Sequence, residues 1–103
     1  MDIWVDIDHT ICDYDEDTLD YTKAKPNFQR IDIVNSLYMK GHRITMWTAR
    51  GTKTGINWYD TTKKQLDSWG LMYHELLMGK PAFDILVDDK ALTRLEQLYH
   101  MTK

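Results

Sequence analysis

A short apolar run at the start of the chain ends on two carboxylates and a hydroxyl. The run covers residues 3–7, and Asp8, His9 and Thr10 follow it. In a strand, residues i and i+2 point to the same side, so Asp6 and Asp8 would share one side of the chain at the strand's end. Two carboxylates held this close repel each other unless a cation lies between them or one keeps its proton. The segment therefore indicates a hard metal, a nucleophilic carboxylate or both, at the carboxyl edge of a sheet.

The rest of the chain alternates between strand-like and helix-like segments. The pattern predicts strands at residues 2–7, 44–47, 72–75 and 83–87, and helices at about 31–38, 58–69 and 91–99. Strands that alternate with helices favour βαβ units and a mainly parallel sheet. With 103 residues, we expect one α/β domain over residues 1–103, with a short polar flap at about 12–27.

The composition limits the classes of protein to which the chain can belong. Hydrophobic residues make up 43% and charged residues 28% of the chain, which is typical of a folded globular domain. The formal net charge of −3 argues against tight non-specific binding to nucleic acid. The single cysteine, Cys12, cannot form an internal disulfide, and no apolar run reaches the length of a membrane span. We expect a cytoplasmic protein without a membrane partner.

Two more of the predicted strands also end in polar side chains. Thr48 and Arg50 follow the second strand, and Asp88 and Asp89 follow the last one. Right-handed crossovers would bring these strand ends to one edge of the sheet, which Lys80 can reach from a loop. Carboxylate oxygens at this density suit Mg²⁺. Acids combined with a lysine and hydroxyl donors are what phosphoryl transfer through an aspartyl intermediate requires.

Taken together, these residues resemble the haloacid dehalogenase superfamily of phosphohydrolases. The four motifs of that family match in order at Asp6-Ile7-Asp8-His9-Thr10, at Thr48, at Lys80 and at Asp88-Asp89. His9 stands where glycine is commonest in the family. A lone Asp-x-Asp is more often a turn, and a lone Asp-Asp more often a helix cap, so the order of all four motifs supports the resemblance. It implies a Rossmann-like three-layer sandwich with a central, mainly parallel sheet.

The resemblance also implies a role for each matched residue. Asp6 would be the nucleophile, and Asp8 would act first as general acid and then as base. Thr48 and Lys80 would bind phosphoryl oxygens. The ligands of Mg²⁺ would be the Asp6 carboxylate, the Asp8 main-chain carbonyl and Asp88. Asp89 and Thr10 would support the site.

The short spacings between the motifs leave no room for the cap domain that many family members carry. The turn Thr48-Ala49-Arg50-Gly51 is similar to that of small phosphatases associated with capsule and sugar biosynthesis, and it also resembles that of polynucleotide kinase 3'-phosphatases. Arg50 is a candidate phosphate clamp, since its planar fork can bind a phosphate through two hydrogen bonds. Whether Arg50 or His9 contacts the substrate stays open.

The function expected from these observations is Mg²⁺-dependent hydrolysis of a phosphosugar or a similar small phosphorylated metabolite. One alternative is a nucleotide or polynucleotide 3'-phosphatase, against which the acidic balance counts. Another is a domain that binds Mg²⁺ or phosphate without turnover. We also expect self-association, because a neighbouring copy could cover the uncapped site and the flap aromatics Tyr14 and Tyr21.

Overall fold

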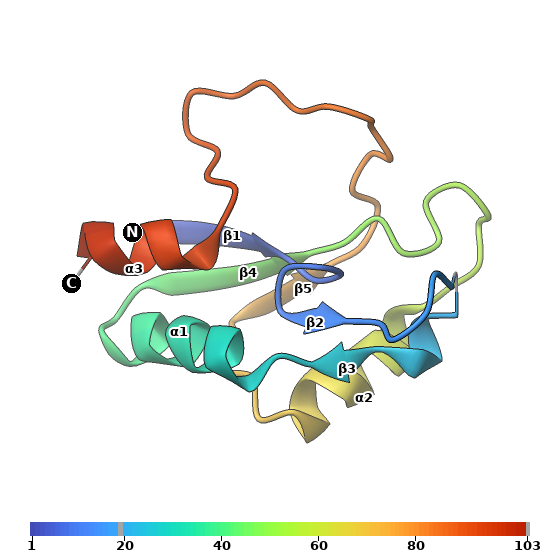
Figure 1. Cartoon of the computed structure of the whole chain (residues 1–103), viewed down its shortest axis with the longest axis horizontal. Coiled ribbons are helices and arrows are strands. Elements are labelled where there is room, and N and C mark those ends of the chain that lie inside the picture. The colour runs from blue at the N-terminus through green and yellow to red at the C-terminus, as the bar shows by residue number, and fades with distance from the viewer. Residues whose placement is uncertain (19, 103) are drawn as a thin grey trace.

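Three parallel strands form the centre of the structure, and helices pack against them (Figure 1). This computed structural model describes residues 1–18 and 20–102, the last without its side chain. In chain order the elements are β1 (Asp2–Asp6), β2 (Cys12–Asp13), the short 3-10 helix η1 (Tyr21–Lys23), β3 (Lys25–Pro26), α1 (Phe28–Met39), β4 (Arg43–Trp47), α2 (Tyr59–Ser68), β5 (Glu75–Leu77) and α3 (Leu95–Thr102). None of these helices is long and apolar enough to span a membrane.

The central sheet has the strand order β1-β4-β5, and both pairings are parallel. Asp6 at the end of β1 lies opposite Trp47 at the end of β4, and Trp47 lies opposite Leu77 at the end of β5. The loops after all three strands therefore start from the same edge. The α/β class, the parallel sheet and the absence of a cap domain are confirmed, although β5 begins three residues later than predicted.

The core lies between the sheet and the helices. It includes Ile3, Val5, Ile7, Ile31, Val34, Leu37, Ile44, Met46 and Leu66. Burial stabilises the fold by about 1.5–3 kcal/mol for each side chain of this size. The first helix, α1, begins because the Asn27 side chain accepts a hydrogen bond from the Arg30 amide, at 3.2 Å. After α1 the chain turns at Gly41, whose φ of +92° suits a glycine.

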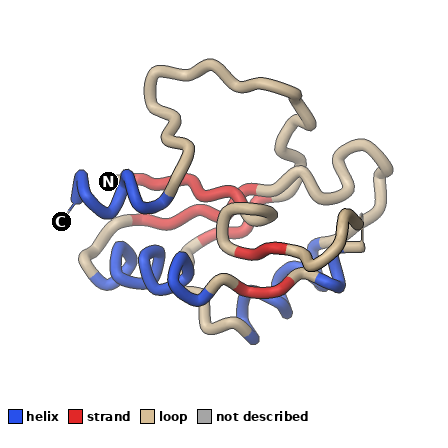
Figure 2. The backbone as a smooth tube through the Cα atoms, in the orientation of Figure 1, coloured by secondary structure: helices blue, strands red, loops and turns tan. Residues whose placement is uncertain are grey.

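The predicted strand at residues 83–87 is wrong. The whole stretch between β5 and α3 is an arch without helix or strand (Figure 2). Within it, Ile85 is 81% exposed and Val87 is 93% exposed. The sequence has the apolar, β-branched character of a strand, but a strand also needs a hydrogen-bonded neighbour, and in this structure the segment pairs with none of the three strands of the sheet.

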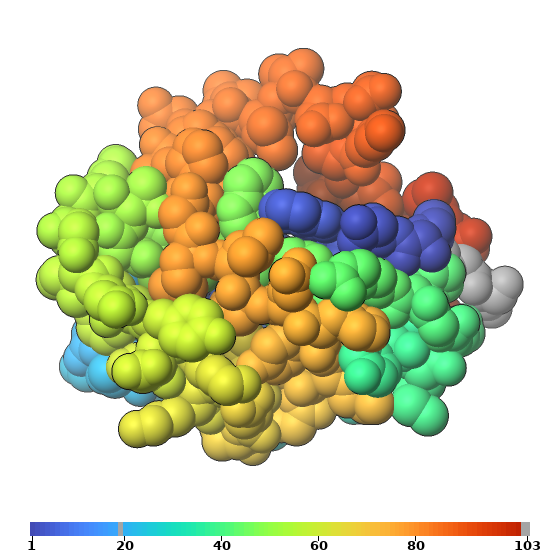
Figure 3. Space-filling model, turned by 180° about the vertical axis from the view of Figure 1, so that it is seen from behind, coloured from blue at the N-terminus to red at the C-terminus, as the bar shows by residue number. Residues whose placement is uncertain are grey.

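As a consequence, β1 is an edge strand. Seen from behind, the atoms of β1 lie open at the surface, with the arch standing away from them (Figure 3). Trp4 on this strand is 51% exposed, and its ring packs edge-on against that of Trp47, with 5.3 Å between the centroids. Long exposed strand edges are unusual in folded proteins.

The polar segment expected as a flap forms a small hairpin. In it, β2 and β3 pair in antiparallel fashion, with Cys12 opposite Pro26 and Asp13 opposite Lys25. An exposed ion pair between Lys25 and Asp15 lies beside this pairing. Leu19, within the expected flap, lies outside the described residues.

Candidate functional site

The chain makes a tight turn directly after β1. Two backbone amides, those of Thr10 and Ile11, donate to the carbonyl of Ile7, at 3.1 and 2.9 Å. His9 has a φ of +62°, which is uncommon for a residue other than glycine, although histidine tolerates it better than most. The His9 ring lies 5.6 Å from the ring of Tyr14, on the flap.

Asp6, the last residue of β1, is flanked by a cation and a hydroxyl. The Lys80 ammonium forms an ion pair with Asp6 Oδ1, at 3.4 Å between Nζ and the oxygen. The Thr10 hydroxyl donates to Asp6 Oδ2, at 3.2 Å. The Asp6 side chain is 38% exposed, whereas that of Lys80 is 16% exposed. The Asp6 carboxylate is thus open to a solute and has a positive charge beside it.

The loops after β4 and β5 hold Lys80 and Thr48 together. The Lys80 amide donates to the Thr48 carbonyl at 3.0 Å, and the Thr52 hydroxyl donates to the Lys80 carbonyl at 2.8 Å. The Thr48 side chain is buried, and its hydroxyl oxygen accepts from the Arg50 amide at 3.1 Å. The Lys80 ammonium lies 5.3 Å from the centre of the Trp47 ring. The structure therefore brings together four of the predicted site residues, namely Asp6, Thr10, Thr48 and Lys80.

Asp8 and Arg50 form a two-pronged ion pair. Arg50 Nε donates to Asp8 Oδ2 at 3.0 Å, and Nη2 donates to Oδ1 at 2.8 Å. The third guanidinium nitrogen, Nη1, donates to Thr62 Oγ1 at 3.1 Å and to Gln65 Oε1 at 2.6 Å, both on α2. The Arg50 side chain is fully buried. Four of the five guanidinium N–H groups of Arg50 therefore bind protein oxygens, so this structure turns its fork toward Asp8 rather than toward an open cleft.

The flap adds further donors to Asp8. The Tyr14 hydroxyl donates to Asp8 Oδ1 at 2.6 Å, and the Cys12 thiol lies 3.6 Å from the same oxygen. Above the Arg50 guanidinium, the Tyr21 ring lies 4.9 Å away, within the range of a cation–π contact. The site residues that sequence analysis missed are thus Tyr14, Tyr21, Thr62 and Gln65. One feature of the sequence points to two of them. Thr62 and Gln65 lie at helical spacing on the same face of α2 as the core residue Leu66, so their polar groups are directed toward the interior.

The pKa directions in this cluster follow from burial and from the ion pair. Burial raises the pKa of Asp8, but the hydrogen bonds and charge of Arg50 outweigh it, so the pKa lies below its ordinary value of 3.8. Burial also lowers the pKa of Arg50, and Asp8 more than reverses this. Burial and the charge of Asp8 raise the pKa of Cys12 to about 12, and burial and the hydrogen bond to Asp8 raise that of Tyr14. At neutral pH the cluster therefore holds a carboxylate and a guanidinium with a neutral phenol and a neutral thiol.

The predicted Mg²⁺ ligands are not brought together. Asp88 is exposed in the arch, and its Oδ1 accepts from the Lys90 amide at 2.8 Å. Asp89 is exposed beside it. Across residues 1–18 and 20–102, no group of three or more His, Cys, Asp or Glu side chains is placed to hold a metal. Because residues 83–87 do not join the sheet, this structure does not bring Asp88 to the edge at which Asp6 and Asp8 lie, and Mg²⁺ binding by these three residues stays a prediction from the sequence.

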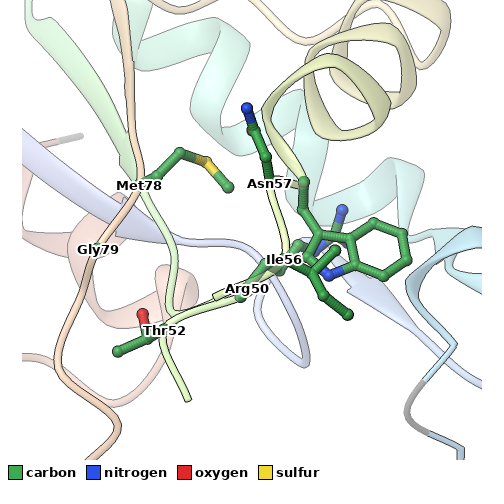
Figure 4. A pocket seen from close by; sticks show the side chains of 8 residues that line it. Arg50, Thr52, Ile56, Asn57, Met78 and Gly79 are labelled. Carbon is green, nitrogen blue, oxygen red and sulfur yellow. The ribbon is translucent and has the colours of Figure 1, made fainter. Parts of the chain in front are cut away.

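A small pocket of about 130 Å³ adjoins the site between the loop after β4 and the end of β5 (Figure 4). Ile56, Trp58 and Met78 give it an apolar lining. In Figure 4 the Met78 side chain, just after the end of β5, extends toward the segment that carries Ile56 and Asn57. Gly51 closes the base of this loop, since a Cβ there would lie 2.0 Å from the Ile56 carbonyl oxygen.

Comparison with known proteins supports the fold. No family model matches the chain, and no curated protein matches it. Among solved structures, the chain is similar to a structural genomics target from Vibrio cholerae, with 26% sequence identity and a TM-score of 0.77, and the alignment covers 100% of both chains. The fold and site thus define a small α/β domain with an acidic centre at the edge of its parallel sheet. The similarity to the Vibrio cholerae protein covers the whole domain, and the description of that protein names no activity.

Proposed function

We propose that this protein hydrolyses phosphate monoesters, with Asp6 as the nucleophile. The observation that supports this best is the Asp6 carboxylate at the end of β1, partly exposed, with the Lys80 ammonium at 3.4 Å. A carboxylate attacks phosphorus to form a covalent intermediate that water then hydrolyses. A phosphate dianion repels a lone carboxylate, and Lys80 is placed to offset that repulsion and to bind phosphoryl oxygens.

The proposed reaction has two steps. In the first, an Asp6 oxygen bonds to phosphorus, and the bond from phosphorus to the leaving oxygen breaks with its electron pair on that oxygen, which takes up a proton from solvent water when it is an alkoxide. In the second, a water oxygen attacks phosphorus, the bond to Asp6 breaks with its electron pair returning to the carboxylate, and a proton of the water passes to Asp8. The pairing with Arg50 favours the ionised form of Asp8, which suits the base of the second step. Leaving groups that need little protonation, such as phenolates, are therefore expected to react fastest.

The proposed substrate is a phosphosugar or a similar small metabolite. The pocket of about 130 Å³ beside the site is large enough for a group of a few atoms. Its Trp58 and Met78 side chains offer apolar surface to such a group. Mg²⁺ dependence remains a prediction from the sequence, and no step above relies on it.

A panel of phosphate esters tests this proposal. The purified chain is assayed with 4-nitrophenyl phosphate, sugar phosphates, nucleotides and 3'-phosphorylated oligonucleotides, each with and without Mg²⁺. We expect release of inorganic phosphate, abolished in Asp6→Asn and retained in Asp2→Asn, a matched control at the exposed start of the same strand. Phosphate binding without any release across the panel would instead identify a domain that binds without turnover.

A further inference from the structure

Donors from separate parts of the chain surround the Asp8 carboxylate. Oδ1 accepts from Arg50 Nη2 at 2.8 Å and from the Tyr14 hydroxyl at 2.6 Å, and the Cys12 thiol lies 3.6 Å from it. Oδ2 accepts from Arg50 Nε at 3.0 Å. Oδ1 is therefore saturated, whereas Oδ2 has accepting capacity left, since a carboxylate oxygen has two lone pairs.

Arg50 is itself held rigidly. Its Nη1 donates to Thr62 and Gln65 on α2, and the Gln65 side-chain amide donates to the Tyr21 carbonyl at 2.7 Å. The loop after β4, the helix α2 and the flap thus meet at one guanidinium. A planar fork fixed in this way also fixes the plane of the carboxylate with which it pairs, which a lysine ammonium would not do.

We propose that Arg50 and Tyr14 are positioning residues that aim Asp8 Oδ2 at the water that hydrolyses the phosphorylated Asp6. This inference rests on the proposed function and assigns the second step to a defined atom. The water oxygen attacks phosphorus, its proton goes to Oδ2, and the electron pair of the broken bond returns to Asp6. Base catalysis needs the accepting atom within hydrogen-bond reach of the water, so rotation of the carboxylate plane slows this step selectively.

Loss of positioning at Asp8 changes the kinetics in a way that a general loss of structure does not. The value of kcat/KM for an aryl phosphate reports steps up to phosphorylation of Asp6. Hydrolysis of the phosphorylated protein affects kcat but not that ratio. Loss of positioning at Asp8 is therefore expected to lower kcat and KM together and to leave kcat/KM nearly unchanged.

Two variants and two matched controls test the inference with 4-nitrophenyl phosphate. Arg50→Lys keeps the charge but removes the fork, and Tyr14→Phe removes one hydroxyl from a residue on the flap. As controls, Arg43→Lys alters an exposed pair with Glu75, and Tyr73→Phe removes another tyrosine donor to an aspartate, Asp67. Steady-state rates are combined with rapid quenching and intact-mass measurement of the phosphorylated protein.

We expect Arg50→Lys and Tyr14→Phe to lower kcat about ten-fold or more. We also expect them to show a burst of nitrophenolate and to accumulate phosphorylated protein, while both controls behave as the wild type. Equal losses in kcat and kcat/KM without accumulation would overturn the inference and leave the proposed function intact. A wild-type protein that neither turns over nor becomes phosphorylated would overturn the proposed function itself. If Arg50→Lys does not fold, the same measurements on Tyr14→Phe still test the inference.

Discussion

Arg50 pairs with Asp8 through two hydrogen bonds, from Nε to Oδ2 at 3.0 Å and from Nη2 to Oδ1 at 2.8 Å, with the arginine side chain fully buried. The pair links the turn after β1 to the loop after β4 across residues far apart in the sequence. The pair also bonds to Thr62 on α2 and to Tyr14 on the flap, so it connects the central sheet to the elements that surround the site.

Removal of the arginine is expected to destabilise the fold strongly. In Arg50→Ala, Asp8 would stay largely buried without its cation, which costs about 3–5 kcal/mol. The exposed pair between Arg43 and Glu75 provides the control, because Arg43→Ala is expected to cost about 1 kcal/mol or less. Urea unfolding of both variants measures the difference. Similar losses for the two would contradict the role given to Arg50.

The stabilising effect of Asp8 is expected to disappear in acid. Its pKa in the folded protein lies below 3.8, so the folded state favours the ionised carboxylate. The contribution is therefore complete above the unfolded pKa, about 3.9, and is lost as the pH falls through the folded value. The difference in free energy of unfolding between wild type and Asp8→Asn should shrink as the pH falls from about 5 to 3. A difference that is constant with pH would contradict this.

Cys12 is expected to be inert in the folded protein. It is fully buried, and its pKa is raised to about 12, so little thiolate is present at neutral pH. Ellman's reagent should react slowly with the native protein and rapidly in urea. Fast labelling under native conditions would show that the flap opens readily around Cys12.

Two glycines with similar backbone angles are expected to respond differently to alanine. Gly51 has a φ of +81°, and a Cβ there would lie 2.0 Å from the Ile56 carbonyl oxygen. Gly55 has a φ of +75°, and nothing lies within 4 Å of its added Cβ. Gly55→Ala should cost about 1 kcal/mol from backbone strain, and Gly51→Ala about 2–3 kcal/mol or more. Thermal unfolding measures the stability of both variants. Equal losses would contradict the close approach of Gly51 to the Ile56 carbonyl.

The arch between β5 and α3 is expected to exchange its amide hydrogens quickly. Residues 83–87 do not pair with the central sheet, whereas residues 43–47 lie in its middle strand. Hydrogen exchange without added metal should therefore be fast in the first segment and slow in the second. Slow exchange at 83–87 would mean that the segment pairs as a strand after all. Repetition with Mg²⁺ shows whether the cation changes this segment.

Local sequence patterns were sufficient to predict much of the fold. Residues 2–7 and 44–47 alternate or concentrate apolar side chains as strands do, and the spacing of Ile31, Val34 and Leu37 defines a helix. Placement of Asp6 beside Lys80 also followed, because parallel strands start their loops from one edge. The strand at 83–87 failed because strand character is local, whereas pairing requires a partner that the sequence pattern does not specify.

The sequence by itself thus determined the α/β class, the strand ends that carry Asp6, Asp8 and Thr48, and the lysine that reaches them. The tertiary structure alone decided the partner of Asp8 and the place of Asp88. It placed Arg50 against Asp8 rather than in an open cleft, and it kept Asp88 exposed in the arch rather than at the end of a fourth strand. The physical reason is that residue type and periodicity act over a few neighbours, whereas ion pairs and ligand sets depend on the path of the chain between distant segments.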